Sequence, residues 1–166
     1  MAQAPEGRLD PGFVRLEASA PFGGAPSTVA DLLRGDPAAW LGEAEPRGTV
    51  EGYRRYAIDL RLRVGGDETP LLTLSKAALL DLGEVAPASE GFEVEIGWRA
   101  ASAAPLFPVF SGRLTVGHEL RIEGIYAPPG GAVGRIADRV LLHTAANGTA
   151  RWLLRQLADA ATRAPG

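Results

Sequence analysis

Side chains that could exchange protons near neutral pH are scarce in this chain. Its 166 residues include no cysteine and two histidines, His118 and His143. The lack of cysteine excludes a thiolate metal site, a disulfide framework and a cysteine nucleophile. Two histidines leave little for a histidine-based metal site, so we expect neither a metal nor another cofactor. Any catalysis would rest on tyrosine, histidine or glutamate.

Each histidine also has a plainer structural interpretation. An acid–base role needs a position in a cavity and a partner that orients the ring. His118 falls in a predicted hairpin loop and lacks the first of these. His143 lies beside the apolar stripe of a predicted C-terminal helix and could reach a cavity, although a partly exposed helix histidine is the commoner case.

The charged side chains fit solvated surfaces better than an active site. Glu93 and Glu95 alternate with apolar residues and therefore share the wet face of a predicted strand. Arg55, Arg61 and Arg63 share an outer face without interleaved aromatic rings, unlike an RNA-binding surface. The net charge of −3 gives no general attraction to nucleic acid or to an anionic membrane.

A glycine-rich stretch, Gly124 to Gly134, leads into the predicted C-terminal helix as a phosphate-binding loop would. It lacks the Gly-Lys-Ser/Thr ending, and Pro128-Pro129 removes two N–H donors. We interpret the stretch as a structural turn. Asp138, in the second turn of the helix, is interpreted as a carboxylate favoured by the helix dipole rather than as a catalytic acid.

These residues must be positioned by strands in the middle of the chain and by a helix at its end. Phe13 to Ser19 predicts a first strand, Ser27 is expected to cap a short helix ending at Gly35, and Asp36-Pro37 to begin a second one. Apolar alternation predicts strands over 56–64, 92–98, 110–116 and 120–126. The stretch 71–85 fits strand or helix, and its surroundings favour strands.

Two of these strands also predict their own register. A three-residue loop at 117–119 places the apolar residues of both strands on one face. It pairs Val116 with Leu120, Leu114 with Ile122 and Phe110 with Tyr126. On the other face the same register sets Arg113 opposite Glu123, which are oppositely charged.

From about residue 132 to 163, apolar residues recur at three- and four-residue intervals and predict a helix. About 30 residues span roughly 45 Å, enough to cross a whole sheet. Asn147-Gly148 is its weak point, where a kink, a close backbone contact or a break would occur. The element order predicts an α+β fold, in which the long helix covers the apolar face of a curved antiparallel sheet and leaves a cavity between them.

This order resembles the START-like superfamily, also called helix-grip or SRPBCC, which includes the birch-pollen-allergen type and polyketide cyclase/dehydrase relatives. The resemblance is carried by Phe107–Gly112, Leu120–Gly124 and Tyr126–Gly131, and continues through Val133-Gly134 and Asp138. It implies a helix-grip fold that binds lipids, steroids, polyketides or other apolar molecules between sheet and helix. The catalytic relatives share no single set of catalytic residues, so the resemblance assigns no active site.

The sequence therefore favours a protein that binds an apolar small molecule, such as a lipid or polyketide, without catalysis. The alternatives are a cyclase/dehydrase-type enzyme using polar residues on the cavity wall, and a protein-interaction module without a ligand. The residues expected to line the cavity are Tyr56, Ile58, Leu60, Trp98, Phe110, Leu114, Tyr126, Val140 and His143. A fully packed core would use the same side chains.

We expect residues 1–12 to be a frayed tail and residues 13–164 to form one START-like domain. Met1 to Pro11 lacks the basic start and apolar middle of a signal peptide, and no segment is long and apolar enough to span a bilayer. The expected location is cytoplasmic, with no nucleic acid partner. The sequence leaves the oligomeric state open.

Overall fold

The computed structural model describes residues 12–65, 70–102, 109–127 and 136–164, with the side chains of 61–65, 70–74 and 136–142 excepted. Eight strands and three helices occur in these ranges. They are β1 (Val14–Pro21), α1 (Pro26–Arg34), α2 (Ala38–Leu41), β2 (Ala44–Val50), β3 (Tyr53–Gly65), β4 (Pro70–Leu82), β5 (Ala86–Ala88), β6 (Gly91–Ala100), β7 (Val109–Val116), β8 (Glu119–Ala127) and α3 (Ile136–Arg163).

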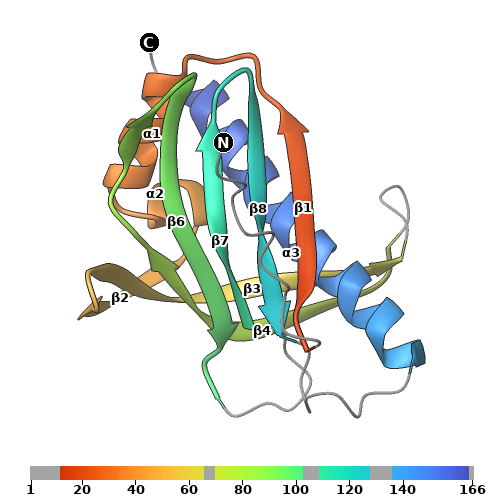
Figure 1. The fold of residues 1–166 in the computed structure, drawn as a ribbon. Coiled ribbons are helices and arrows are strands. Elements are labelled where there is room, and N and C mark those ends of the chain that lie inside the picture. Colours follow the sequence, from red (N-terminus) through yellow and green to blue (C-terminus); the bar gives the residue numbers. More distant parts are fainter. Residues whose placement is uncertain (1–11, 66–69, 103–108, 128–135, 165–166) are drawn as a thin grey trace, which may run out of the picture.

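All eight strands belong to one antiparallel sheet, ordered β1-β8-β7-β6-β4-β3-β2, with β5 paired to β6. The first strand lies beside the last, because β1 pairs with β8 over its whole length. Figure 1 shows that β3 and β4 cross the direction of β6, β7 and β8, so the sheet curls strongly. A sheet of this shape has a concave inner face, which a helix can cover.

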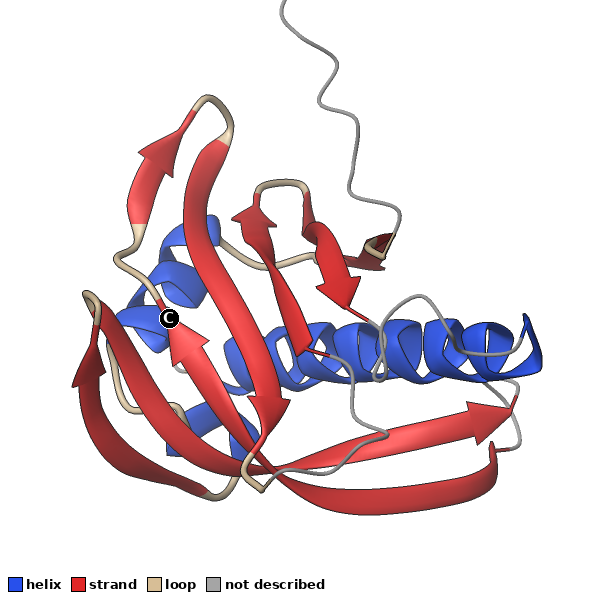
Figure 2. Ribbon diagram, turned by 60° about the horizontal axis from the view of Figure 1, so that its bottom comes forward, coloured by secondary structure: helices blue, strands red, loops and turns tan. Residues whose placement is uncertain are grey.

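The long helix α3 covers that inner face, as Figure 2 shows from the end of the curled sheet. It contacts β1, β3 and β8, and α1 and α2 pack against it as well. The helix is continuous through Asn147 and Gly148, so the weak point produces no break. Ala146, Thr149 and Ala150 are fully buried there, and their packing holds the turn together. Within the described residues, no helix is long and apolar enough to cross a membrane.

The predicted hairpin register is confirmed. Val116 pairs with Leu120, Leu114 with Ile122, and Arg113 with Glu123. The apolar residues that these pairs bring to the inner face are buried, namely Phe110, Leu114 and Val116 on β7 and Leu120, Ile122 and Tyr126 on β8. On the outer face, Arg113 lies opposite Glu123 in the register but forms an ion pair with Glu93, at 3.4 Å.

Two local expectations need correction, and a third is confirmed. Ser27 lies inside α1, which begins at Pro26 with Ala25 as its N-cap, because proline is well suited to the first helical position. Strands β2 and β5 were not expected, and both are short or poor in apolar residues. The ambiguous stretch 71–85 is mainly one long strand, β4, which pairs with β3 over most of its length.

The end of α1 is fixed by an arginine from another element. The Arg54 guanidinium on β3 donates to the carbonyl oxygens of Leu33 and Gly35, and to that of Arg34 at 2.9 Å. Carbonyl groups at a helix C-terminus lack partners within the helix and carry partial negative charge. Arg54 thus ties the short helices to the sheet. At the start of α2 the N-cap is Pro37, one residue later than predicted, and the backbone N–H of Ala38 donates to Asp36 Oδ1 at 2.9 Å.

Candidate functional site

An aromatic row crosses the inner face of the sheet. Tyr126 on β8 pairs with Phe110 on β7, and Phe110 pairs with Trp98 on β6. The register continues through Leu80 to Tyr56 on β3. The rings of Trp98 and Phe110 stack with centroids 3.9 Å apart and an interplanar angle of 20°. We call Tyr126, Phe110 and Trp98 the aromatic row; none of the three is more than 2% exposed.

Two glycines make room for the ring of Phe110. Gly112 and Gly124 are paired across β7 and β8, one step along the inner face from Phe110 and Tyr126. A Cβ atom on Gly112 would lie 2.6 Å from Phe110 Cζ, and one on Gly124 would lie 2.7 Å from the same atom. These distances are far below van der Waals contact. The ring therefore lies over the two glycines, and their missing side chains set its position.

A chain of polar contacts joins the aromatic row to α3. The Tyr126 hydroxyl lies 3.2 Å from His143 Nδ1, and Asn147 Nδ2 lies 2.9 Å from His143 Nε2. With the Asn147 amide donating to Nε2, the ring proton is on Nδ1 and is donated to the Tyr126 oxygen. Asn147 orients the ring from one helical turn away. Because His143 is exposed while Tyr126 is buried, this contact is where the row meets the surface.

Burial raises the pKa of Tyr126 above the usual tyrosine value. The hydroxyl therefore stays protonated throughout the physiological range and acts as a hydrogen-bond partner rather than as a base. A protonated phenol in an apolar setting can donate to a carbonyl or ether oxygen. Together with the imidazole, it presents two polar groups at one end of an apolar row.

Three buried polar atoms have no hydrogen-bond partner among the described residues. They are Nε1 of Trp98, Nε1 of Trp40 and Oγ1 of Thr149. Leaving a buried donor unsatisfied costs about 1–3 kcal/mol. Trp98 belongs to the row, Thr149 follows Asn147 by two residues on α3, and Trp40 lies on α2, which packs against α3. These atoms could hydrogen-bond to a small molecule held between sheet and helix.

The structure places most of the expected cavity residues together. Seven of them are buried on the inner face, namely Tyr56, Ile58, Leu60, Trp98, Phe110, Leu114 and Tyr126. His143 joins the row through Tyr126, whereas the side chain of Val140 lies outside the described residues. His118 is exposed in the β7–β8 turn, as expected. The stretch 128–135 and the side chain of Asp138 also lie outside the description.

The sequence did not identify Asn147, Thr149 and Trp40 as members of the region around the aromatic row. Asn147 had a usable signal, since it lies four residues after His143 and such residues are neighbours on a helix. Thr149 and Trp40 have no comparable signal. Their burial depends on how α2 and α3 meet, which no local pattern encodes.

The outer face of the sheet carries a second feature, a charged hollow of about 810 Å³. Several of its polar side chains contact one another: Arg55 binds Asp81 through two contacts of 2.7 and 2.8 Å, and Tyr53 donates to Glu95. The hydrogen bond to Glu95 raises the pKa of Tyr53, and the one to Asp81 raises that of Arg55. As the sequence predicts, Arg55 and Glu95 lie on the outer face of the sheet, opposite the face that carries the apolar residues.

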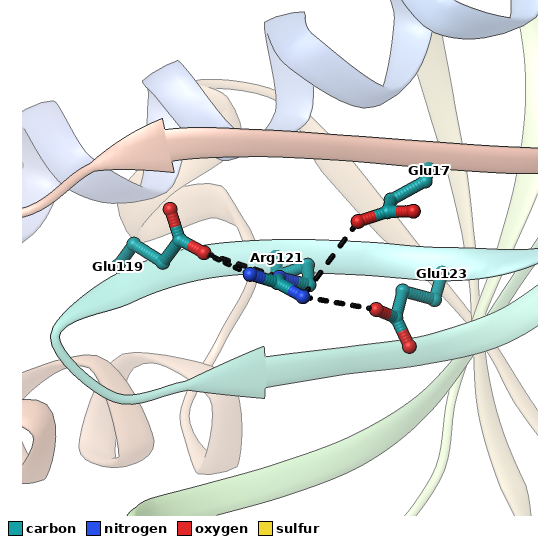
Figure 3. A network of polar contacts seen from close by, with 4 residues as sticks. All are labelled: Glu17, Glu119, Arg121 and Glu123. Carbon is teal, nitrogen blue, oxygen red and sulfur yellow. Dashed lines mark hydrogen bonds and ion pairs between the residues drawn. The ribbon is translucent and has the colours of Figure 1, made fainter.

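Beside this hollow, three glutamates surround Arg121, as Figure 3 shows. Glu119 contacts the guanidinium directly, Glu123 lies at 3.3 Å and Glu17 of β1 at 3.6 Å. The hydrogen bond to Glu119 is the main reason that the pKa of Arg121 is raised. A cation in the centre makes this cluster an ion-pair network rather than a metal site. Within the described ranges, no group of three or more histidine, aspartate or glutamate residues is arranged to hold a metal.

The fold has a solved counterpart. No protein-family model matches the sequence, and no curated protein matches it. The structure is similar to that of the di-domain ARO/CYC protein BexL from the BE-7585A biosynthetic pathway, with a TM-score of 0.59 at 14% sequence identity. The likeness covers 93% of this chain and 52% of BexL, so this chain spans about half of its length. A hypothetical protein from Helicobacter pylori is similar with a TM-score of 0.46 at 11% identity, over 90% of this chain and 84% of the other. The chain has a helix-grip fold, as the sequence predicts.

Proposed function

We propose that the protein binds an apolar small molecule bearing a polar group, of the lipid or polyketide kind, between the sheet and α3. The observation that carries this proposal is the contact between buried Tyr126 and exposed His143. It sets a pair of polar groups at the surface end of an apolar aromatic row. Ligand sites in proteins commonly combine a largely apolar lining with a few polar groups that fix orientation.

The row supplies the apolar part of the site. Burying an aromatic or aliphatic group against it contributes about 25 cal/mol per Å² of apolar area. The indole N–H of Trp98 offers an unsatisfied donor to an oxygen of the ligand. The three rings are closed off from solvent, and the contact of Tyr126 with exposed His143 is where the row comes nearest to the surface. The likeness to BexL supports a biosynthetic ligand, since BexL belongs to a biosynthetic pathway.

An apolar fluorescent probe tests the proposal. Anilinonaphthalene sulfonate, an apolar dye with one polar group, is titrated into the folded protein while the emission of the dye is recorded. We expect saturable binding that His143→Ala weakens about fivefold, since one polar contact is lost. His118→Ala is the matched control and should bind as the unaltered protein does. Lack of saturable binding, or equal loss in both variants, would contradict the proposal.

Native mass spectrometry adds a direct readout. Protein purified from its own host is sprayed under non-denaturing conditions, and its mass is compared with that of the chain alone. The proposal expects an added mass that is lost on denaturation. Trp98→Phe, which keeps an aromatic ring but removes the unsatisfied indole N–H, should retain less of the added mass.

One observation favours a second candidate, a cyclase-type enzyme. The Tyr126–His143–Asn147 chain has the form of an oriented acid–base pair, in which a protonated phenol can donate to a carbonyl oxygen as negative charge develops there. A linear poly-β-ketone thioester is the discriminating probe. Cyclisation faster than in buffer, lost in His143→Gln with binding retained, would favour the enzyme. Binding without turnover favours the non-catalytic function.

A further inference from the structure

The hydroxyl of Tyr126 can donate one hydrogen bond and accept two. Among the described residues its hydrogen-bond partner is His143, whose Nδ1 lies 3.2 Å away. The other ring nitrogen, Nε2, lies 2.9 Å from Nδ2 of Asn147. Because an amide nitrogen can only donate, Nε2 accepts and the proton of the neutral ring is on Nδ1. Tyr126 therefore accepts from His143, and its own proton has no acceptor within the described residues.

The second polar atom of the aromatic row has the same character. The indole Nε1–H of Trp98 is buried and has no hydrogen-bond partner among the described residues. An indole nitrogen can donate but cannot accept. Phe110 lies between Trp98 and Tyr126 in the register of the sheet. The row thus carries two unmatched groups, one on each side of Phe110, and both are donors.

The interior around the row carries no charge. Among the described residues no charged side chain is buried, and the buried polar side chains are those of tyrosine, tryptophan and threonine. An ammonium group on a ligand would need a buried carboxylate, and a carboxylate would need a buried cation, because an unpaired charge is costly there. A neutral oxygen, as in a ketone, an ester or an ether, needs only a donor. The two unmatched donors therefore favour a neutral acceptor oxygen.

We propose that Asn147 is a positioning residue that holds the proton of His143 on Nδ1 and so leaves the Tyr126 proton for a neutral acceptor oxygen of the ligand. This inference rests on the proposed function and adds the polarity of the group that the site selects. Asn147 is half-buried and lies one helical turn from His143, so its amide reaches the ring from the same helix. With the ring proton on Nε2 instead, Nδ1 would accept from Tyr126, and the hydroxyl would offer a ligand only its lone pairs. The site would then favour an N–H group over a carbonyl oxygen.

The position of the ring proton can be measured without a ligand. The chain has two histidines, so His118→Ala leaves His143 as the one imidazole to observe. Long-range proton–nitrogen NMR correlation at about pH 9, above the ordinary titration range of imidazole, tells which ring nitrogen is protonated. We expect the proton on Nδ1, and a shift toward Nε2 in Asn147→Leu, which keeps the shape of the side chain but cannot donate. A proton on Nε2 with Asn147 in place, or an unchanged ring in Asn147→Leu, would overturn the inference.

Three tricyclic probes of nearly the same shape test the selectivity of the site. Fluorenone carries an acceptor oxygen, carbazole carries an N–H donor, and fluorene carries neither. The affinity of each is measured by displacement of anilinonaphthalene sulfonate. We expect fluorenone to bind about fivefold more tightly than fluorene, and carbazole no more tightly than fluorene. Equal affinities for the three probes would overturn the inference and leave the proposed function standing, whereas a lack of dye binding would contradict the proposed function itself.

Two variants assign the selectivity to its residues. Tyr126→Phe and Asn147→Leu should each lose most of the preference for fluorenone while binding fluorene as before, which also shows that both variants fold. Equal weakening of all three probes in Asn147→Leu would indicate a merely structural role and overturn the inference. A preference for fluorenone that persists in both variants would assign the donor to Trp98 and likewise overturn it.

Discussion

The hydroxyl of Tyr126, on a side chain that is 1% exposed, lies 3.2 Å from Nδ1 of His143, which is exposed on α3. This pair joins the last strand of the sheet to the helix that covers it. It also joins the buried aromatic row to an exposed polar side chain on α3.

Replacing Tyr126 with phenylalanine should change how stability depends on pH. Burial raises the pKa of Tyr126 above its ordinary value of 10.0, so the unfolded chain loses this proton first. The free energy of unfolding therefore falls as pH rises from about 10 toward the folded-state pKa. In Tyr126→Phe this part of the slope is absent. Urea unfolding at a series of alkaline pH values measures it, and equal slopes in both proteins would contradict the assignment.

A methyl group on Gly124 should destabilise the fold strongly. Its Cβ would lie 2.3 Å from the Ser111 carbonyl oxygen and 2.6 Å from Gly112 Cα, which are backbone atoms that cannot turn aside. We expect Gly124→Ala to lower the free energy of unfolding by about 3 kcal/mol. Gly23→Ala is the control, because a Cβ there meets nothing within 4 Å. Chemical unfolding of both variants shows whether the close backbone contacts at Gly124, rather than the loss of any glycine, lower the free energy of unfolding.

Loss of the Arg54 side chain should loosen α1 from the sheet. Its guanidinium serves three consecutive carbonyl groups, those of Leu33, Arg34 and Gly35. Arg54→Ala should cost about 2 kcal/mol of stability, since hydrogen bonds to charged groups contribute about 1.5–3 kcal/mol. Amide hydrogen exchange should rise first in α1. Arg47→Ala, at an exposed site on β2, should leave both readouts unchanged; a similar loss there would refute a specific capping role.

Two ion pairs of equal length should differ in strength. Arg55–Asp81 and Arg47–Glu45 both have N–O distances of 2.7 Å, but their side-chain exposures are 17% and 21% against 51% and 68%. Double-mutant cycles should give a coupling of about 1–2 kcal/mol for the bidentate, half-buried pair. The exposed pair should give less than about 0.5 kcal/mol. The coupling energy of the exposed pair should also disappear at a lower salt concentration than that of the half-buried pair. The reverse order would contradict a stronger interaction in the half-buried pair.

Much of the fold was predictable because its signals are local. The alternation in β6, β7 and β8 follows from the two-residue period of a strand, and the loop at 117–119 then fixes which residues pair. The helical period of α3 is equally direct. Strand β2 carries no such signal, because both its faces are largely exposed and its pairing with β3 alone makes it a strand.

The candidate site was only partly predictable, because some of its contacts have no local signal in the sequence. The two-residue period of the strands indicated which residues face inward, and it selected Tyr126, Phe110 and Trp98, all of which are buried. The contact of His143 with Tyr126, the burial of Thr149 and Trp40 without hydrogen-bond partners among the described residues, and the pairing of β1 with β8 follow only from the folded arrangement. Those relations join elements distant in the chain, and their geometry depends on the curl of the whole sheet around α3. At 166 residues with no cysteine and two histidines, the sequence limited the available chemistry, and the fold determined where that chemistry lies.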